Sequence, residues 1–111
     1  MHGFVDAMLL ASISFRAQPH KRAEILSAID ETIARMRHTA GCGRCRLYVD
    51  TEDPNSFYVL SEWQMPGDAD AFFDSRAFQI FRHIRILLRE EPVIVLDQVE
   101  SRATRVIETR Q

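Results

Sequence analysis

The fold is decided by one stretch of alternating residues, Phe57-Tyr-Val-Leu-Ser-Glu-Trp63, which ends in the single tryptophan of the chain. Successive side chains of a β-strand point to opposite faces of the sheet, so this alternation predicts a strand. One face is expected to carry Phe57, Val59, Ser61 and Trp63, and the other Tyr58, Leu60, Glu62 and Gln64. Because both faces hold large apolar groups, we expect the sheet to be covered on both sides.

The segment before this strand supplies its hairpin partner. Cys45, Leu47 and Val49 alternate with Arg44, Arg46 and Asp50, as in a strand with one more apolar face. The intervening Thr51-Glu-Asp-Pro-Asn-Ser56 is rich in residues that favour turns. Residues 42–64 therefore predict a β-hairpin.

The elements before the hairpin are a strand and a helix. The apolar run at residues 8–15 is too short for an amphipathic helix and predicts the first strand. Apolar residues at spacings of three and four predict a helix over roughly residues 19–38, with Gly41 as its C-terminal cap.

Helical segments and a strand follow the hairpin. A short helix capped by Asp68 or Asp70 is expected first, and a second helical segment begins around Ser75 and ends at Pro92. Residues 93–99 predict the fourth strand. The order β-α-β-β-α-β predicts an α+β, ferredoxin-like split βαβ fold with a four-stranded antiparallel sheet.

In this fold the helices cover one face of the sheet only. The other face, which holds Tyr58 and Leu60, would be wet in a monomer. An exposed apolar face of that size marks an interface, so we expect a homodimer. Residues 102–107 extend the last strand as a C-terminal arm.

Length, charge and hydropathy narrow the class of protein. The 111 residues fit one domain, 1–111, with a core of about 8–107. A net charge of -2 indicates neither a nucleic-acid surface nor a polybasic membrane patch. The N-terminus lacks an export signal, and no apolar run reaches the length of a membrane-spanning helix. We expect a soluble, cytoplasmic protein.

The two cysteines, Cys42 and Cys45, form a Cys-x-x-Cys pair. A thioredoxin-type pair begins a helix, whereas this one precedes a strand pattern. With His38 they give three nearby zinc ligands, one fewer than a structural site needs. Residues three apart in a strand also face opposite sides. We interpret them as small apolar side chains at a turn-to-strand junction and expect no metal site.

Four short motifs follow one another along the chain. They are Gly41-Cys42, Leu47-Tyr48 with the turn Glu52-Asp-Pro54, Leu60-Ser-Glu-Trp63, and Ser75-Arg-Ala-Phe78. Their order and spacing resemble the antibiotic biosynthesis monooxygenase (ABM) family over about residues 8–107. The resemblance implies a homodimer whose two sheets close into a dimeric α/β barrel, with a pocket between the sheet and the helices of each subunit.

The resemblance also implies an activity. Some family members are oxidoreductases that oxidise anthrones, quinols or other aromatic molecules with molecular oxygen and without a metal or flavin. The leading hypothesis is therefore a cofactor-independent monooxygenase whose partners are a small planar aromatic molecule and oxygen, and we expect no cofactor. Many members have no established activity, so a non-catalytic binding or sensory module on the same fold is the alternative.

The chain departs from the family pattern at several positions. Many members have a histidine just before the serine of the last motif and another shortly after it, where this chain has Phe73-Asp74 and Arg76-Ala77. In the haem-degrading branch the iron ligand is a histidine four residues after the phenylalanine, a place taken here by Arg82. The asparagine of that branch corresponds best to Ser12. Haem binding or degradation is thus a third, weaker hypothesis.

Oxygenation without a cofactor needs an aromatic cavity, a base and a donor for the developing oxyanion. The candidate walls are Trp63, Phe57, Phe72 and Phe81, with the indole N–H of Trp63 as a catalytic donor. The alternative is that these rings are ordinary core residues, because apolar residues at helical spacing usually pack.

The polar candidates are three serines and one histidine. Ser12, Ser14 and Ser61 lie in apolar strands and would line the substrate pocket if they share the face of Trp63; otherwise nearby backbone satisfies them. His83 is the candidate catalytic base, because imidazole exchanges protons near neutral pH. It lies about 40° outside the apolar arc of its helix, so the alternative is a boundary histidine on a solvated face.

Overall fold

The structure, a computed structural model, describes residues 2–5 and 8–109, with the backbone alone at residues 2–5, 80 and 81. One antiparallel sheet has the strand order β3-β4-β2-β5. Its strands are β2 (Met8–Arg16), β3 (Cys42–Val49), β4 (Ser56–Trp63) and β5 (Val93–Val99). The helices are α1 (Arg22–Arg37), α2 (Pro66–Phe73), α3 (Ile80–His83) and the 3₁₀ turn η1 (Arg85–Leu87).

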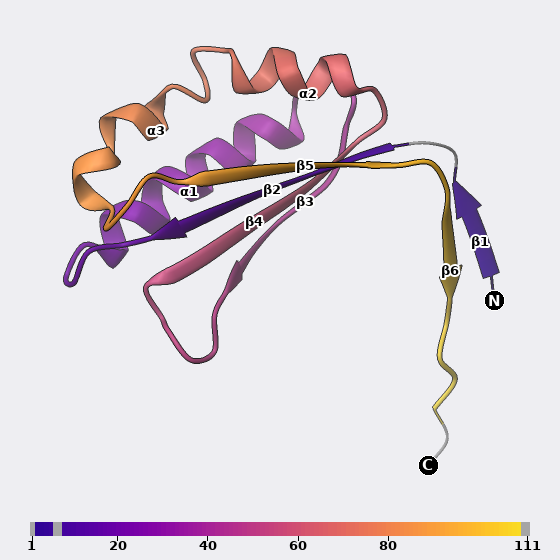
Figure 1. The fold of residues 1–111 in the computed structure, drawn as a ribbon, viewed down its shortest axis with the longest axis horizontal. Coiled ribbons are helices and arrows are strands. Elements are labelled where there is room, and N and C mark those ends of the chain that lie inside the picture. Colours follow the sequence, from indigo (N-terminus) through magenta and orange to yellow (C-terminus); the bar gives the residue numbers. More distant parts are fainter. Residues whose placement is uncertain (1, 6–7, 110–111) are drawn as a thin grey trace.

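All helices lie on one side of this sheet (Figure 1). The strand order and the single helical layer confirm the ferredoxin-like α+β fold. The helices and the sheet form two layers of secondary structure, as Figure 1 shows.

The alternation of β4 is confirmed by its register with β2. Trp63 pairs with Leu9, Ser61 with Ala11, Val59 with Ile13 and Phe57 with Phe15, and all eight residues are buried. This inner face packs against the apolar side of α1, where Ile25, Ile29 and Met36 are fully buried. The central strands thus carry the core on their helix side.

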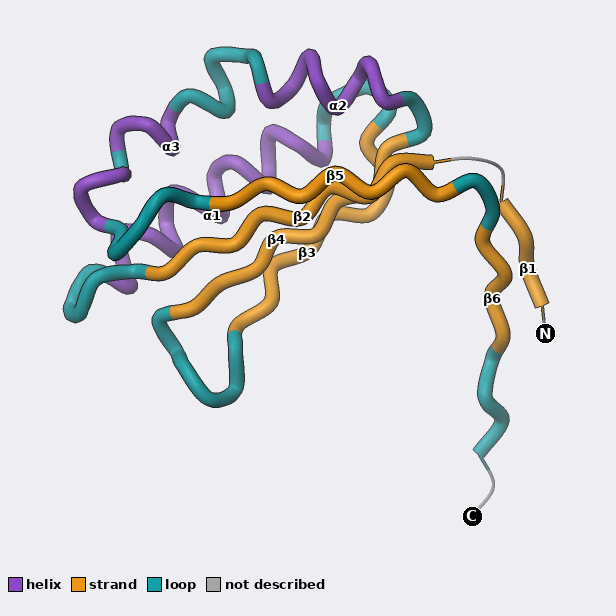
Figure 2. The backbone as a smooth tube through the Cα atoms, in the orientation of Figure 1, coloured by secondary structure: helices purple, strands orange, loops and turns teal. Residues whose placement is uncertain are grey.

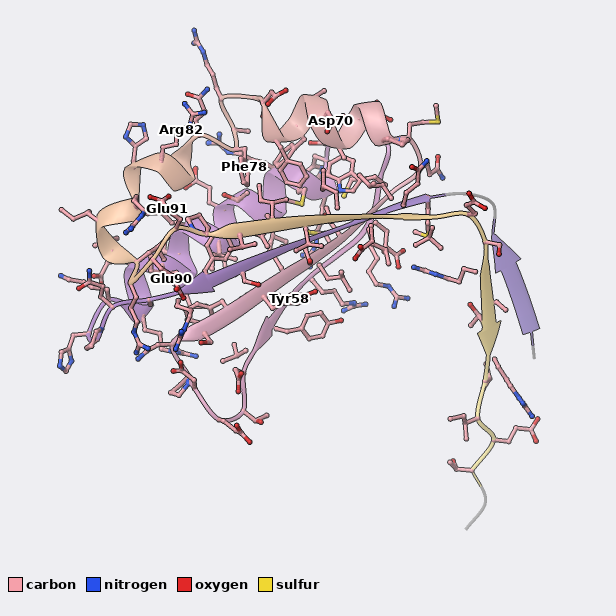
Figure 3. The ribbon with its side chains drawn as sticks, viewed as in Figure 1. Tyr58, Asp70, Phe78, Arg82, Glu90 and Glu91 are labelled. Atoms are coloured by element: carbon pink, nitrogen blue, oxygen red, sulfur yellow. The ribbon has the colours of Figure 1, made fainter. Side chains whose placement is uncertain are left out.

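The outer face of the sheet has no covering layer in the single chain. Tyr48 and Tyr58 are paired across β3 and β4, and their side chains are 46% and 42% exposed. Figure 3 shows Tyr58 pointing away from the helices. On the edge strand, Val93 and Val95 of the same face are 55% and 46% exposed. The sheet therefore has two apolar faces, as the sequence predicts, but only one is covered here.

The first helix is shorter than predicted at both ends. It begins at Arg22 because His20 adopts a left-handed backbone conformation, with a φ of 67°, which no helix can continue. It ends at Arg37 with His38 as its C-cap, so the prediction that Gly41 caps this helix is wrong. Gly41 instead has a φ of 85° at the turn that leads into β3, and its carbonyl accepts a hydrogen bond from the Gln64 N–H.

The helical region after β4 is more broken than predicted. Pro66 occupies the first turn of α2, and neither Asp68 nor Asp70 is its N-cap residue, which is Met65. A series of turns over residues 74–79 separates α2 from the short α3, as Figure 2 shows. The hydroxyl of Ser75 donates to the Phe72 carbonyl at 2.6 Å, and the Phe78 N–H donates to the Ser75 carbonyl. These bonds turn the chain where a continuous helix would run.

A second, two-stranded sheet pairs the two ends of the chain. β1 (His2–Val5) runs antiparallel to β6 (Arg102–Arg105), and Figure 1 shows this ribbon turned away from the main sheet. The predicted C-terminal arm is therefore a separate strand rather than an extension of β5, and its pairing with β1 was not predicted. Arg102 Nη1 donates to Glu62 Oε1 at 2.8 Å, which ties the ribbon to the outer face of β4.

Within the described residues, no helix combines the length and the apolar character needed to cross a membrane.

Two glycines give a matched test of backbone conformation. A Cβ on Gly41 would overlap the carboxylate of Asp68 and would hold an L-residue at positive φ, so Gly41→Ala is expected to lower the free energy of unfolding by about 1–3 kcal/mol. A Cβ on Gly67 of α2 has no atom within 4 Å, so Gly67→Ala should raise it by about 0.5 kcal/mol. Urea denaturation of both variants measures the difference; equal effects would contradict this account.

Candidate functional site

The indole of Trp63 is fully buried in the core. Its Nε1–H donates to Ser61 Oγ at 2.9 Å, and this hydroxyl donates in turn to the Ala11 carbonyl at 3.3 Å. A buried N–H that already has a partner would lose that hydrogen bond if it turned to a ligand. The structure therefore gives Trp63 a structural hydrogen bond to Ser61 within β4, and the Ser61 hydroxyl in turn joins β4 to β2 through the Ala11 carbonyl.

An aromatic cluster leads outward from this tryptophan. Its ring centroid lies 5.8 Å from that of Phe72 and 6.2 Å from that of Phe73. Phe73 and Phe78 meet edge to face at 5.0 Å. These separations are typical of favourable aromatic pairs, so the four rings form one packed unit from the core to the surface.

The outer rings of this cluster form part of a cavity between the α2–α3 segment and the start of β5. Its volume is about 330 Å³, at the lower end of the range for small-molecule pockets. The apolar wall consists of Phe73, Phe78, Pro92 and Ile94, and the polar lining of Asp74, Gln79, Arg82, Arg85 and Glu91. Figure 3 shows Phe78, Arg82 and Glu91 on the helix side of the sheet around this space.

The cavity exists because the helices do not reach the edge strand. Ile94 and Leu96 of β5 pair with Ile13 and Ala11 of β2 and so point to the helix side. Their side chains are nevertheless 38% and 45% exposed, whereas Ile13 and Ala11 are buried. The core is closed over the central strands and open over β5.

Two arginines line the cavity in different electrostatic states. Arg85 Nε lies 2.9 Å from Glu91 Oε1, although its N–H does not point at that oxygen, so the contact is an ion pair without a hydrogen bond. Arg85 Nη1 also donates to the Leu88 carbonyl at 3.2 Å. Arg82, by contrast, has an exposed guanidinium with no ion-pair partner among the described side chains.

The predicted aromatic walls lie elsewhere in the molecule. Phe72 is buried between Trp63 and the outer rings. Phe57 is buried toward the start of β4, where the guanidinium of Arg22 lies 5.5 Å from its ring centre. Neither is among the residues that line the cavity. Phe81 belongs to α3, but its side chain lies outside the described part of the structure.

The expectation that Ser12 and Ser14 share the face of Trp63 is wrong. Ser12 pairs with Leu60 and Ser14 with Tyr58, whereas Ser61 pairs with Ala11. Directly paired residues of an antiparallel sheet point to the same face, so these two serines lie on the outer face. A register that differs by one residue from the expected one accounts for the reversal.

His83 is exposed at the end of α3 and is not among the cavity-lining residues. The neighbouring Arg82 lines the cavity instead. Consecutive helical residues are separated by about 100° around the helix axis, which explains why one side chain lines the cavity and the next does not. The role of His83 as a base stays a prediction.

The candidate site residues named from the sequence did not include Phe73 and Phe78, although the Phe72–Phe78 segment was expected to direct its phenylalanines toward one interior. Both were treated as parts of helices, and the turns between them, which bring their rings together, were not predicted. The signal that was present is Ser75, a residue that bonds to nearby backbone and favours turns over helix interiors. Arg82 was assigned to a solvated face, and Glu91 was given no role in the site.

The cysteines share one face, contrary to expectation. An irregularity between Cys42 and Cys45 shifts the register of β3, so Cys42 pairs with Trp63 and Cys45 with Ser61. Both thiols are free, and Cys45 is buried with its Sγ 3.3 Å from the sulfur of Met36. Burial raises the pKa of the Cys45 thiol to about 11, with the nearby Cys42 a lesser cause, and burial also raises that of Cys42.

These pKa values predict an unreactive pair. A thiol with a pKa of about 11 is almost wholly protonated at pH 8, so Cys45 should react with iodoacetamide roughly a hundredfold more slowly than an exposed cysteine. Its rate should rise about tenfold per pH unit up to that pKa. Mass spectrometry of pulse-labelled Cys42→Ser protein measures this rate, with the urea-unfolded chain as control. Equal rates in the folded and unfolded chains would contradict the prediction.

The fold and the cavity together define a small α+β protein with an aromatic-walled pocket on the helix side of its sheet. The model of one family, Antibiotic biosynthesis monooxygenase, matches residues 8–83. The chain belongs to this family, which confirms the resemblance inferred from its motifs.

Solved structures share the fold at low sequence identity. A crystal structure of an antibiotic biosynthesis monooxygenase superposes with a TM-score of 0.74 at 22% identity, covering 80% of this chain and 95% of the other. A conserved protein from Methanosarcina mazei Go1 gives 0.74 at 24% identity, covering 83% and 91%. A protein from Shewanella oneidensis gives 0.75 at 18% identity, covering 93% and 98%. No curated protein matches the sequence.

The described residues offer no evident metal centre. No group of three or more His, Cys, Asp or Glu side chains within residues 2–5 and 8–109 could hold a metal ion. The residues that line the aromatic cavity include no imidazole, and the guanidinium of Arg82 is not an iron ligand.

Proposed function

We propose that the protein is a small, cytoplasmic, homodimeric monooxygenase that oxidises a planar aromatic or quinol-like molecule with molecular oxygen and no cofactor. Family membership supports the class of reaction. The observation that carries the proposal is the cavity of about 330 Å³ walled by Phe73 and Phe78, which suits a flat apolar ring system.

The chemistry depends on an electron-rich substrate. A base removes a proton, and the resulting anion reacts with oxygen. For an anthrone, the CH₂ group becomes a carbonyl, one oxygen atom of O₂ is retained, and the other leaves as water with both hydrogens. In this proposal the protein contributes a cavity whose apolar wall holds the ring, together with a base that removes the proton.

In this proposal Trp63 acts through its neighbours. Its packing against Phe72 and Phe73 holds the wall of the cavity, and its bond to Ser61 fixes the indole. His83 is retained as the base to be tested, because imidazole is the commonest general base in enzymes, although this side chain is not among the cavity-lining residues. An imidazole that serves as base is worth about a hundredfold or more in rate.

The activity is tested by oxygen uptake with a panel of hydroquinones and anthrones. At least one compound should give uptake above buffer, and Phe78→Ala should lower kcat/KM by about tenfold because a wall of the cavity is lost. Leu26→Ala is the control, since Leu26 is also partly buried against the core but lies on α1, outside the cavity lining. His83→Gln tests the base on the same assay.

If no compound raised oxygen uptake above that of buffer, the oxygenase hypothesis would be contradicted. A compound that raises the melting temperature without oxygen uptake would instead favour a binding or sensory module, because a ligand that binds only the folded chain stabilises it. The specific observation that favours this alternative is the lack of an imidazole among the cavity-lining residues. A shifted Soret band on addition of hemin would favour the haem hypothesis.

The proposed homodimer is supported by the open outer face of the sheet. The uncovered side of the sheet exposes the apolar side chains of Tyr48, Tyr58, Val93 and Val95, and the helices lie on the other side. A second copy applied to this face would complete the barrel implied by the family and bury these side chains.

Sedimentation is expected to give about twice the 12.8 kDa of one chain. Leu60→Gln should shift the protein toward the monomer, because it places an amide in the middle of the outer face. Glu24→Gln, at an exposed position on α1, is the control and should leave the mass unchanged. A wild-type monomer at micromolar concentration would contradict the dimer.

A further inference from the structure

The cavity carries two opposite charges that the described side chains leave without ion-pair partners. Arg82 comes from α3, and Asp74 is the C-cap residue of α2, so the turns over residues 74–79 separate them along the chain. The other two charges of the lining, those of Arg85 and Glu91, neutralise each other at 2.9 Å.

We propose that the cavity binds a hydroxylated aromatic acid, whose carboxylate pairs with Arg82 and whose hydroxyl donates to the carboxylate of Asp74. This assignment rests on the proposed function in taking the same cavity as the substrate site. It adds the substrate class: a flat ring system that carries both an anionic group and a hydrogen-bond donor.

The shape of the lining supports the ring. Phe73 and Phe78 are fixed by the aromatic cluster behind them, and Ile94 and Pro92 supply the apolar surface opposite the helical segment. A flat ring placed among these side chains removes apolar surface from water on both partners. A volume of about 330 Å³ favours a ligand of two or three fused rings over a large one.

The charges of Arg82 and Asp74 support the carboxylate and the hydroxyl of the proposed ligand. A planar guanidinium matches a carboxylate with two parallel N–H bonds, and a carboxylate such as Asp74 is an acceptor only, so it selects a donor. Apolar walls strengthen both interactions by excluding water from one side. Arg85 is unsuited to bind the ligand's carboxylate, because Glu91 already neutralises its charge and the Leu88 carbonyl already accepts a hydrogen bond from its Nη1.

The test uses the full-length protein and three probes in isothermal titration calorimetry. The first is a hydroxynaphthoic acid whose carboxylate and hydroxyl lie on different rings. The second replaces the acid by a neutral carboxamide, and the third lacks the hydroxyl. The wild-type protein should bind the acid about fivefold more tightly than the carboxamide, the preference expected of a partly exposed charge pair. It should also bind the hydroxylated acid more tightly than the acid without the hydroxyl.

Two variants assign these preferences to residues. Arg82→Gln should remove the preference for the acid while leaving carboxamide binding within twofold of wild type. Asp74→Ala should remove only the preference for the hydroxyl. Arg76→Gln is the control, because Arg76 is an exposed arginine of the same turns that is not among the lining residues; it should retain both preferences.

Equal affinities for the acid and the carboxamide in the wild type would overturn the assignment, as would an acid preference that survives Arg82→Gln. These binding results are independent of turnover. A binding preference for the acid without oxygen uptake would contradict the oxygenase hypothesis but support the ligand class. Oxygen uptake without any binding preference would contradict the ligand class alone.

Discussion

The hydrogen bond between the Trp63 indole and Ser61 is the interaction on which the site depends. A fully buried indole N–H without a partner costs free energy, so the ring is stable only where Ser61 Oγ can accept it. Both residues lie on the inner face of β4, and Ser61 also binds the backbone of β2, so the ring is fixed relative to two central strands. Phe72 and Phe73 pack against that fixed ring, and Phe73 is also part of the cavity wall. The aromatic wall is therefore an extension of the core.

The strands could be predicted from the sequence because alternation is a strong, local signal. Each of the four main strands lies where its pattern placed it, and the inner residues of β4 are those that the period of two selects. What alternation cannot give is register. Ser12 and Ser14 share a face with each other, as the pattern requires, but which face of β4 they join depends on a one-residue choice set by tertiary pairing. The predicted pocket therefore wrongly included Ser12 and Ser14, which lie on the outer face.

The other differences arise from local interruptions of a regular pattern. A register shift in β3 places Cys42 and Cys45 on one face, although residues three apart in a regular strand would point to opposite faces. The turns at residues 74–79 place Phe73 and Phe78 edge to face, although a second helical segment was expected to begin at about Ser75. Bulges and turns of this kind depend on a few hydrogen bonds, such as that from Ser75 to Phe72, and they leave little trace in hydrophobic periodicity.

Two apolar surfaces remain open in this chain, and they differ in shape. On the helix side, the short α3 and the turns before it leave Ile94 and Leu96 of the edge strand exposed beside a concave space with charged groups at its margin. On the opposite side, Tyr48, Tyr58 and Val95 lie on an extended sheet face without a covering layer. A concave space lined by rings and a few charges suits a small molecule, whereas an extended apolar face suits another sheet. The same edge strand, β5, borders both surfaces, so a partner that holds β5 from outside would also hold one wall of the cavity.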